Sequence, residues 1–390
     1  MSGSVAHIMP ANGGAGRTVY LREVQGAEGT AATLTAADYA PALAVALTPA
    51  STMVTRRTVS PEQPGNRPID TMIHATYSAQ MEVVPRTISA ADGSDCPVCD
   101  PELRAGGWAR TADSTDKTYT YVLQTAPSEV LSVQIVQINA GNTRYIQTAA
   151  QDVRGSATIE ARAGETIKVA IEGLGPLTSP SSVTNPSPAT GSAWSGTLTD
   201  PTGDPLVFEG ARTYIYDPAD ATLYGGGSLS SPDTAGDVLY FKIDPTRAVT
   251  ARTGASAAGG IHGALPNATG ATITIEVELT AGDVFTLQAK KVAATPLYFY
   301  ARVTQRGTSN TMTVLCWFCI TALSETEVVD SRFVASITGT LLYPPDVSDN
   351  SPPAGTSPTQ AIGAASNYGL PLMPSTTLPK GLAFIQFATP

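Results

Sequence analysis

The stretch TITIEVEL, residues Thr272 to Leu279, decides the fold class. Apolar and polar side chains alternate along its whole length, and in an extended chain successive side chains point to opposite faces. The alternation therefore predicts a β-strand with one buried face and one face in contact with water. Strands of this kind are typical of antiparallel sheets.

Similar stretches recur along the chain and predict an all-β fold. In the first half we expect strands over 73–84, 119–124, 130–138, 143–148, 156–161 and 166–172, and in the second half over 212–216, 238–243, 272–279, 297–304, 312–323 and 331–343. The 35 Gly and 30 Pro residues disfavour long helices, because each weakens or breaks one.

One short helix is expected, over 96–109. Asp100 is suited to cap its start, and Pro101 to occupy its first position. Gly106 and Gly107 are suited to end it. The second half shows no evident counterpart beyond a short spacer over 288–294.

The order of these features repeats, which predicts two tandem β domains. Both halves contain, in the same order, a long polar loop (an excursion), an alternating strand, a spacer, further strands and a closing strand. The two series are offset by about 200 residues. We expect one domain over 1–175 and a second over 206–343, joined by a Pro/Ser/Thr-rich linker over 176–205. An extension over 344–390 ends in an apolar strand at 382–387. This strand should pair with a sheet of the same or a neighbouring chain, because a free apolar strand favours aggregation.

Composition and charge restrict the class and the partners of the chain. With 14% charged and 42% hydrophobic residues, a disordered chain or a coiled coil is excluded. The chain carries 23 Lys and Arg residues and 33 Asp and Glu residues. Binding to nucleic acid needs Lys and Arg to neutralise phosphates, so this acidic balance disfavours a nucleic-acid-binding protein. It does not disfavour a protein that DNA passes without being bound. No apolar run approaches the roughly 20 residues of a membrane helix, and residues 1–17 show no secretory signal. We expect a soluble chain made in the cytoplasm, without a membrane partner.

Two cysteine pairs have the spacing found in metal and redox sites. Cys96 and Cys99 precede the expected helix, and Cys316 and Cys319 lie in an expected strand. Residues three apart in a strand point to opposite faces, so both thiols of the second pair cannot bind one zinc ion there. The first pair lacks the strand-helix-strand context of a redox motif. Buried structural cysteines are the favoured interpretation, with a zinc site and a redox pair as alternatives.

Groups suited to acid–base catalysis are sparse. The histidines, His7, His74 and His262, are read as solvated or locally packed imidazoles. Glu276 and Glu278 share one face of a strand at a separation of about 7 Å, which a glycosidase could use. A solvated acidic face is the commoner origin of such a pair. We therefore expect no enzyme, with no catalytic residue, no metal and no cofactor.

The first half resembles a known family. The series VYLRE at 19–23, GAEGT at 26–30 and TAADYA at 35–40 is similar to the opening of major tail tube proteins of long-tailed, non-contractile (siphovirus-type) bacteriophages. The run PELRAGGW at 101–108 resembles the short helix of that family, and 166–173 resembles its closing strand. The resemblance covers residues 1–175, and the second half matches by the order of its elements alone.

The resemblance implies a β-sandwich or barrel-like tube domain, duplicated in this chain, with a long arm loop and at most one short helix in each copy. In that family six domains close a ring, so two domains in tandem imply a homotrimeric ring with pseudo-sixfold symmetry. Helically stacked rings form the hollow tail tube of the virion, through which genome DNA passes during ejection without specific binding. The implied partners are further copies of the chain and other tail proteins, namely the tape measure, terminator and distal tail proteins.

Two sets of residues acquire expected roles from the resemblance. The polar excursion over 51–68 lies where the family carries the arm loop that reaches into adjacent rings, and its candidate contact residues are Arg56, Arg57 and Arg67. The candidates for an acidic lumen that repels DNA are Glu160, Glu172, Glu276 and Glu278, with an outward solvated face as the alternative.

Two other functions fit parts of the sequence. A virion-surface or secreted two-domain β-sandwich, acting as an adhesin or decoration protein, would also be rich in Thr, Ser, Gly and Pro. It does not explain the repeated excursions or the apolar C-terminal strand. A β-rich hydrolase built around Glu276 and Glu278 lacks a visible acid–base partner.

Overall fold

The structure is a computed structural model of the chain. It describes residues 17–55, 68–124, 129–139, 142–178, 189–191, 198, 203–217, 222–224, 238–253, 261–267, 270–329, 332–342 and 381–389. These residues form strands β1 to β19, two α-helices and one short 3-10 helix, η1 (Ala36–Asp38). The protein is all-β, as the alternating stretches predict.

Antiparallel pairing arranges the first half as a row of strands. Its order is β1 (Arg17–Val24), β6 (Leu131–Ile138), β7 (Tyr145–Arg162), β8 (Lys168–Thr178), β3 (Pro68–Glu82) and β2 (Ala44–Thr55). The prediction of two strands over 143–148 and 156–161 is wrong, because β7 runs through both. A β-bulge between Ala150 and Arg154 bends β7 without ending it, so its two ends join different strands.

The second half repeats this pairing order. Its strands, in order of pairing, are β10 (Arg212–Asp217), β16 (Leu297–Thr304), β17 (Thr311–Val329), β18 (Arg332–Leu342), β15 (Thr272–Leu279) and β12 (Val238–Asp244). By position, β17 corresponds to β7, β18 to β8, β15 to β3 and β12 to β2. The stretch TITIEVEL is β15, and its apolar side chains are buried, as predicted.

A pairing between β7 and β12 joins the two halves. The resulting sheet, which we call the joint sheet, has the order β2-β3-β8-β7-β12-β15-β18-β17. One hydrophobic cluster draws on both halves and includes Trp108, Ile159, Phe241 and Ile275. The halves therefore share a core. β8 continues to Thr178, beyond the start of the expected linker at 176.

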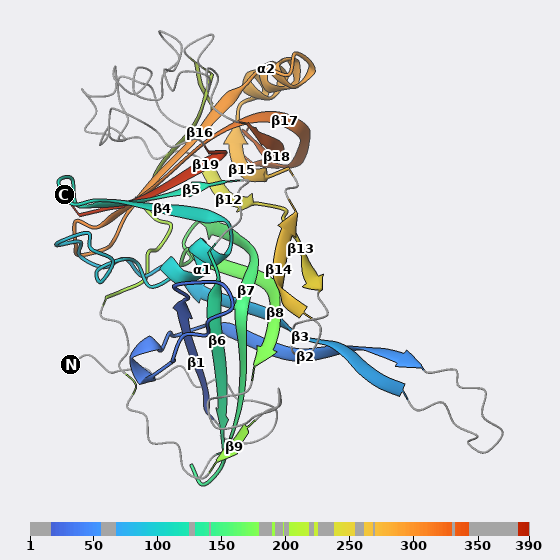
Figure 1. Cartoon of the computed structure of the whole chain (residues 1–390). Helices are drawn as coiled ribbons and strands as arrows, with labels where there is room; N and C mark the ends of the chain where they lie inside the picture. The colour runs from blue at the N-terminus through green and yellow to red at the C-terminus, as the bar shows by residue number, and fades with distance from the viewer. Residues whose placement is uncertain are drawn as a thin grey trace.

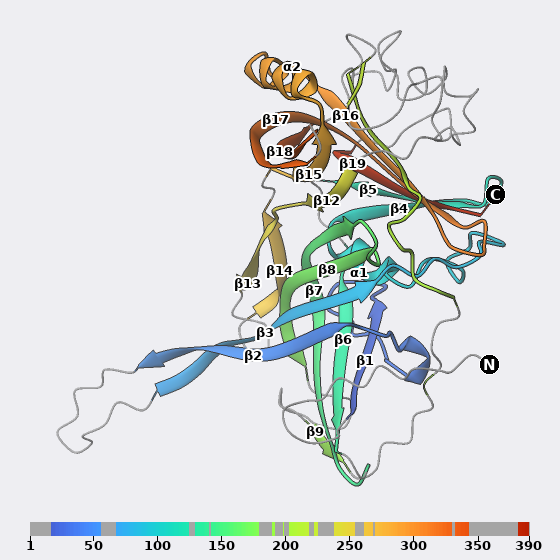
Figure 2. The ribbon, with the colours of Figure 1, turned by 180° about the vertical axis from the view of Figure 1, so that it is seen from behind.

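The strand β19 (Ala383–Ala388) forms a second junction between the halves. It lies between β5 (Thr118–Leu123) and β17 and is antiparallel to both. On the other side of β5 lies β4 (Trp108–Asp113). Most side chains of β19 are buried, and Figure 2 shows the strand in red among strands of both halves. The apolar C-terminal strand thus pairs within its own chain.

Two hairpins differ in how they lie on the molecule. In Figure 1 the distal part of the β2–β3 hairpin projects away from the other strands, whereas β13 (Ala248–Thr253) and β14 (Ile261–Asn267) lie beside β7 and β8. β13 and β14 form a separate two-stranded sheet. Two short strands complete the described part: β11 (Thr222–Tyr224) pairs with β10, and β9 (Ala189–Gly191) with the start of β7.

The short helix α1 (Asp100–Ala105) lies within the range expected for it and ends at Gly106. Its N-cap is Cys99, so the prediction that Asp100 caps the helix is wrong. The Asp100 carboxylate instead accepts hydrogen bonds from the Tyr121 hydroxyl at 2.7 Å and from the Arg110 guanidinium at 3.1 Å. These tertiary partners replace the local cap.

The helix α2 (Ala281–Val292) occupies a region where the sequence analysis expects only a spacer over 288–294. A capping box starts it: Thr280 Oγ1 accepts a hydrogen bond from the Asp283 amide, and Asp283 Oδ2 accepts one from the Thr280 amide, both at 3.2 Å. Val284 and Leu287 are its buried residues. Within the described ranges, neither helix is long and apolar enough to cross a membrane.

Candidate functional site

The four acidic candidates for a lumen lie on one face of the joint sheet. Register pairs Glu160 of β7 with Lys242 of β12, and Glu276 of β15 with Tyr240 of β12. Directly opposed residues share a face, and so do residues two apart. Glu172 and Glu278 therefore lie on the same face as Glu160 and Glu276. We call it the polar face, because the opposite face carries the buried apolar side chains of the core.

Basic groups partly offset the acids of the polar face. Arg162 Nη1 lies 3.7 Å from Glu276 Oε2, and its guanidinium lies 4.7 Å from the centre of the Tyr240 ring. Burial, together with the nearby Glu160 carboxylate, raises the pKa of Tyr240. Lys242 Nζ lies 3.2 Å from Asp244 Oδ2. The face is therefore a mixed polar surface with an acidic excess rather than a purely acidic one.

The junction between β7 and β12 is an edge-to-edge contact of main chains backed by the core. Ile159 opposes Ile243, and Ala161 opposes Phe241, and all four side chains are buried. Just beyond the ladder, the Ala163 amide donates to the Leu239 carbonyl at 2.8 Å. Arg162 and Glu276 span the same junction on the polar face.

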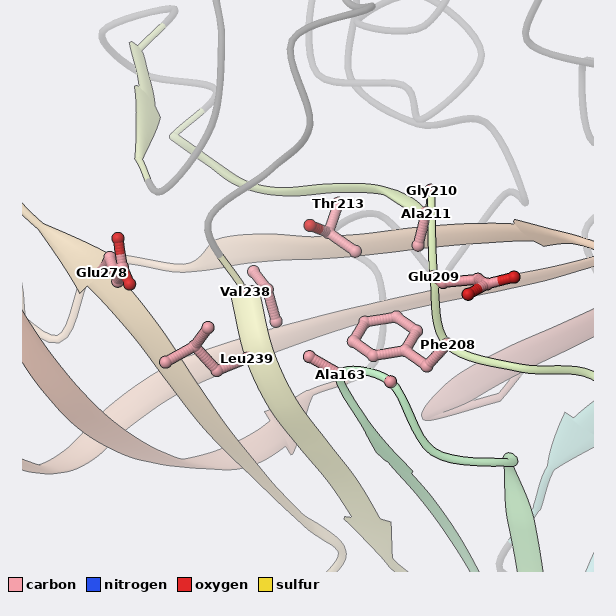
Figure 3. A pocket seen from close by; sticks show the side chains of 10 residues that line it. Ala163, Phe208, Glu209, Gly210, Ala211, Thr213, Val238, Leu239 and Glu278 are labelled. Carbon is pink, nitrogen blue, oxygen red and sulfur yellow. The ribbon is translucent and has the colours of Figure 1, made fainter.

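A cavity of about 330 Å³ opens beside this junction (Figure 3). It is lined by the β7–β8 turn, the segment 208–211 and the starts of β10 and β12. Its polar side chains are Thr213, Glu209 and Glu278, and Figure 3 shows the two carboxylates at opposite ends. The described residues that line it include no histidine, cysteine, lysine or arginine.

The joint sheet has two open edges in the described part of the chain. β2 pairs with β3 on one side, and the described strands offer it no partner on the other. Pro49 lies in β2, where a proline is tolerated because an edge strand donates fewer ladder hydrogen bonds. The C-terminal part of β17, from Ala322 onward, pairs with β18 alone among the described strands.

The candidate arm residues Arg56, Arg57 and Arg67 lie outside the described residues. The strands that lead to them are described, and the β2–β3 ladder runs from Ala44 opposite Gln80 to Thr55 opposite Pro68, with a bulge between Ala50 and Thr52. The region expected to be a loop from residue 51 is therefore strand up to Thr55 and again from Pro68.

A buried polar cluster, which the local sequence pattern does not predict, fixes α1 to β1. Arg22 Nε and the Tyr20 hydroxyl both donate to Glu102 Oε1 at 2.7 Å, and the Tyr77 hydroxyl bonds to that of Tyr20. Burial opposes the charge of Arg22, but the Glu102 carboxylate outweighs it and keeps the pKa of the guanidinium above its ordinary value. Arg22 and Glu102 are both in the motifs that carry the family resemblance, but their pairing joins positions far apart in the sequence.

The cysteine environments favour structural roles. Burial raises the pKa of Cys96 to about 11, and it raises the pKa of Cys99 well above its ordinary value. A reactive redox thiol needs a lowered pKa, so this pair lacks that chemical signature. Cys316 lies in the core, and Cys319 Sγ donates to the Ala294 carbonyl at 3.2 Å. Among the residues the structure describes, no cluster of three or more His, Cys, Asp or Glu is placed to hold a metal ion.

The two histidines that the structure describes lie on different strands. His74 lies in β3 and His262 in β14, while His7 lies outside the described residues.

The sequence was compared with models of protein families and with characterised proteins, and it matches none of them.

Proposed function

We propose that the protein is a structural subunit that polymerises through its sheet edges into stacked rings and forms the hollow tube of a phage tail. The single observation that carries this proposal is the β7–β12 junction. It joins two halves that have the same pairing order, and it does so edge to edge. A chain that contains such a junction already contains a template for joining one copy to the next.

The open edges supply the matching contact between copies. β17 has the position in the second half that β7 has in the first, and β2 has the position of β12. A second junction, between β17 of one copy and β2 of the next, would repeat the first. Such a heterologous contact closes into a ring when its rotation allows, and closure protects both open edges. The family resemblance sets the expected number at three chains per ring.

The part of the polar face that stays at least partly exposed, around Glu160, Arg162, Glu276 and Glu278, would then line the lumen. Its acids have partners such as Arg162 and Lys242, and an acidic excess remains. Phosphate groups of DNA are attracted by clustered Lys and Arg, so a surface with balanced charge and an acidic excess lets DNA slide without holding it.

Electron microscopy of the purified full chain tests the proposal. We expect rings or tubes at high protein concentration. Hydrogen exchange should slow at 44–48 of β2 and at 322–329 of β17 in the assembled fraction relative to the monomer fraction, because edge pairing protects amides. A protein that stays monomeric at high concentration and exchanges rapidly at both edges would contradict the proposal and favour a decoration protein or adhesin.

A further inference from the structure

The two halves carry hairpins in corresponding positions that lie differently. In the first half, β2 and β3 continue as one ladder past the bulge at Ala50. In the second half, the β12–β15 ladder stops where Asp244 opposes Thr272, and the chain continues as the separate β13–β14 hairpin. The β13–β14 hairpin therefore corresponds to the distal part of β2–β3.

The β13–β14 hairpin packs on β7 through specific contacts. Arg154 Nη1 donates to the Ala264 carbonyl at 3.0 Å, and Arg154 Nη2 donates to Glu28 at 3.3 Å. Arg252 of β13 donates to the other oxygen of Glu28 at 3.1 Å. A Cβ added at Gly263 would lie 3.3 Å from that same oxygen, so the hairpin approaches the Glu28 segment closely.

The turn that leads into β13 is anchored as well. Arg247 is buried, and its amide donates to Ser156 Oγ on β7 at 3.4 Å. A Cβ at Gly107 would lie 2.1 Å from Arg247 Nη1, so the guanidinium occupies the space beside the end of α1 that a side chain there would need. Gly107 has a φ of 105°, which also favours glycine. The hairpin is thus part of the contact between the halves.

The corresponding surface on β17 is uncovered. On β7 the contact region includes Asp152 and Arg154, and both are buried. On β17, Thr321, Ala322 and Ser324 follow the bulge at the same level of the strand, and all three are exposed in the single chain. Ala322 and Ser324 lie on the polar face, as Arg154 does. The β7 surface of the first half is thus covered by the hairpin of the second half. The β17 surface of the second half is bare, and the hairpin of the first half projects.

We infer that the distal β2–β3 hairpin of one copy packs across β17 and β18 of the next copy, at Thr321, Ala322 and Ser324. This inference rests on the proposed function, in which β2 of one copy pairs with β17 of the next. That pairing would bring the β2–β3 hairpin to this surface. Within one chain, the pairing of β12 with β7 brings the β13–β14 hairpin to β7 in the same way. The occupant is a second copy of this chain. The segment 51–55 of β2 is uncharged, and β3 carries Asp70 in the distal ladder. The three receiving residues are uncharged, so they offer no partner for an ion pair of the Arg252–Glu28 kind.

Mixed cysteine cross-linking tests the inference. Met53→Cys, in the distal part of β2, and Ala322→Cys are made in separate full-length chains that also carry Cys96→Ser and Cys319→Ser, since those native thiols are only partly buried. The two proteins are mixed, assembled and treated with a short bis-maleimide. We expect a covalent dimer in the mixture that is absent from either protein alone. In the control, the second chain carries Ser309→Cys in place of Ala322→Cys. Ser309 is exposed and lies in the β16–β17 turn.

A second variant measures the same contact without cross-linking. Ala322→Arg adds bulk and charge to an exposed position, so the monomer should fold normally, as judged by circular dichroism. The protein concentration needed for assembly should rise about tenfold, equivalent to about 1.4 kcal/mol, and Ser309→Arg should leave it unchanged. Rings or tubes that form without the cross-link would overturn the hairpin contact and leave the proposed function standing. Absence of any assembly by the unmodified chain would overturn both.

Discussion

Arg162 of β7 and Glu276 of β15 lie 3.7 Å apart across the intervening strand β12, and so connect the two halves of the chain on the polar face of the joint sheet. The side chains remain 49% and 33% exposed. Their contact therefore marks the junction without being its main source of stability, since ion pairs at this exposure are weak. The buried ladder beneath them, with Phe241 and Ile243, holds the halves together.

Removing the Glu276 charge should cost little. We expect Glu276→Gln to lower the free energy of unfolding by less than about 1 kcal/mol in urea denaturation, because water screens the pair. Glu278→Gln, on the same strand face, serves as the control. A loss well above that figure for Glu276→Gln alone would mean that the ion pair carries the junction.

Removing Glu102 should cost far more, because Glu102 is fully buried and neutralises Arg22. Glu102→Ala leaves a buried guanidinium without its carboxylate, and we expect a loss of about 3–5 kcal/mol in the free energy of unfolding. Glu129→Ala is the matched control, because Glu129 pairs with Arg104 at the surface and is 46% exposed. Equal effects of the two substitutions would contradict the role assigned to burial.

Asp95 should make stability depend on pH in the acid range. Burial opposes its charge, but hydrogen bonds from the Tyr119 hydroxyl and from the amides of Ser89, Ala90 and Ala91 outweigh it and lower its pKa. A lowered folded-state pKa stabilises the protein above the unfolded value of about 3.9, and this contribution is lost as the pH falls below it. Thermal unfolding is measured at a series of pH values from 6 downward. The midpoint temperature of unfolding should depend less on pH for Asp95→Asn than for the unmodified chain. Superimposable profiles would contradict this.

Close packing at the end of α1 should make Gly106 sensitive to the smallest addition. A Cβ there would lie 2.0 Å from the Ala157 Cβ and 2.6 Å from the Ala157 nitrogen. Gly106→Ala should therefore destabilise the fold by about 1–3 kcal/mol in chemical denaturation. Gly26→Ala is the control, because nothing lies within 4 Å of a Cβ at that position. The argument fails if both variants unfold at the same denaturant concentration.

The C-terminal strand should be as important for stability as the strands on either side. Ile385 is fully buried in β19, and Ile385→Ala should lower the free energy of unfolding by about 2–5 kcal/mol. Ile146, which is 46% exposed, provides the control substitution Ile146→Ala. A small effect at Ile385 would show that β19 contributes little to the native core.

The sequence predicted most strands because alternation is a local property. The alternation correctly predicted strands at TITIEVEL and in the run 73–84, and most of the apolar side chains in these strands are buried. It missed α2, although Thr280 and Asp283 form a recognisable capping box, because the large apolar residues of the helix do not mark one face: Val284 and Leu287 are buried, whereas Phe285 and Val292 are exposed. It divided β7 in two because a bulge interrupts the alternation without ending the strand.

The candidate surfaces were predictable only in part. The polarity of Glu160, Glu172, Glu276 and Glu278 was visible in the sequence, but their shared face follows from the register between distant strands. The β7–β12 junction, the Arg22–Glu102 pair and the position of β19 all join residues far apart in the chain. Local pattern has no means of choosing among such partners, because every alternating strand offers similar edges.

The position of β19 also sets an order of events during synthesis. β19 pairs with β5 and with β17, yet it follows both in the sequence. While a ribosome is making the chain, the seam between these strands stays open until residue 388 has emerged. A nascent chain or a prematurely terminated one exposes these two strands, so the completed seam distinguishes a finished chain from an unfinished one.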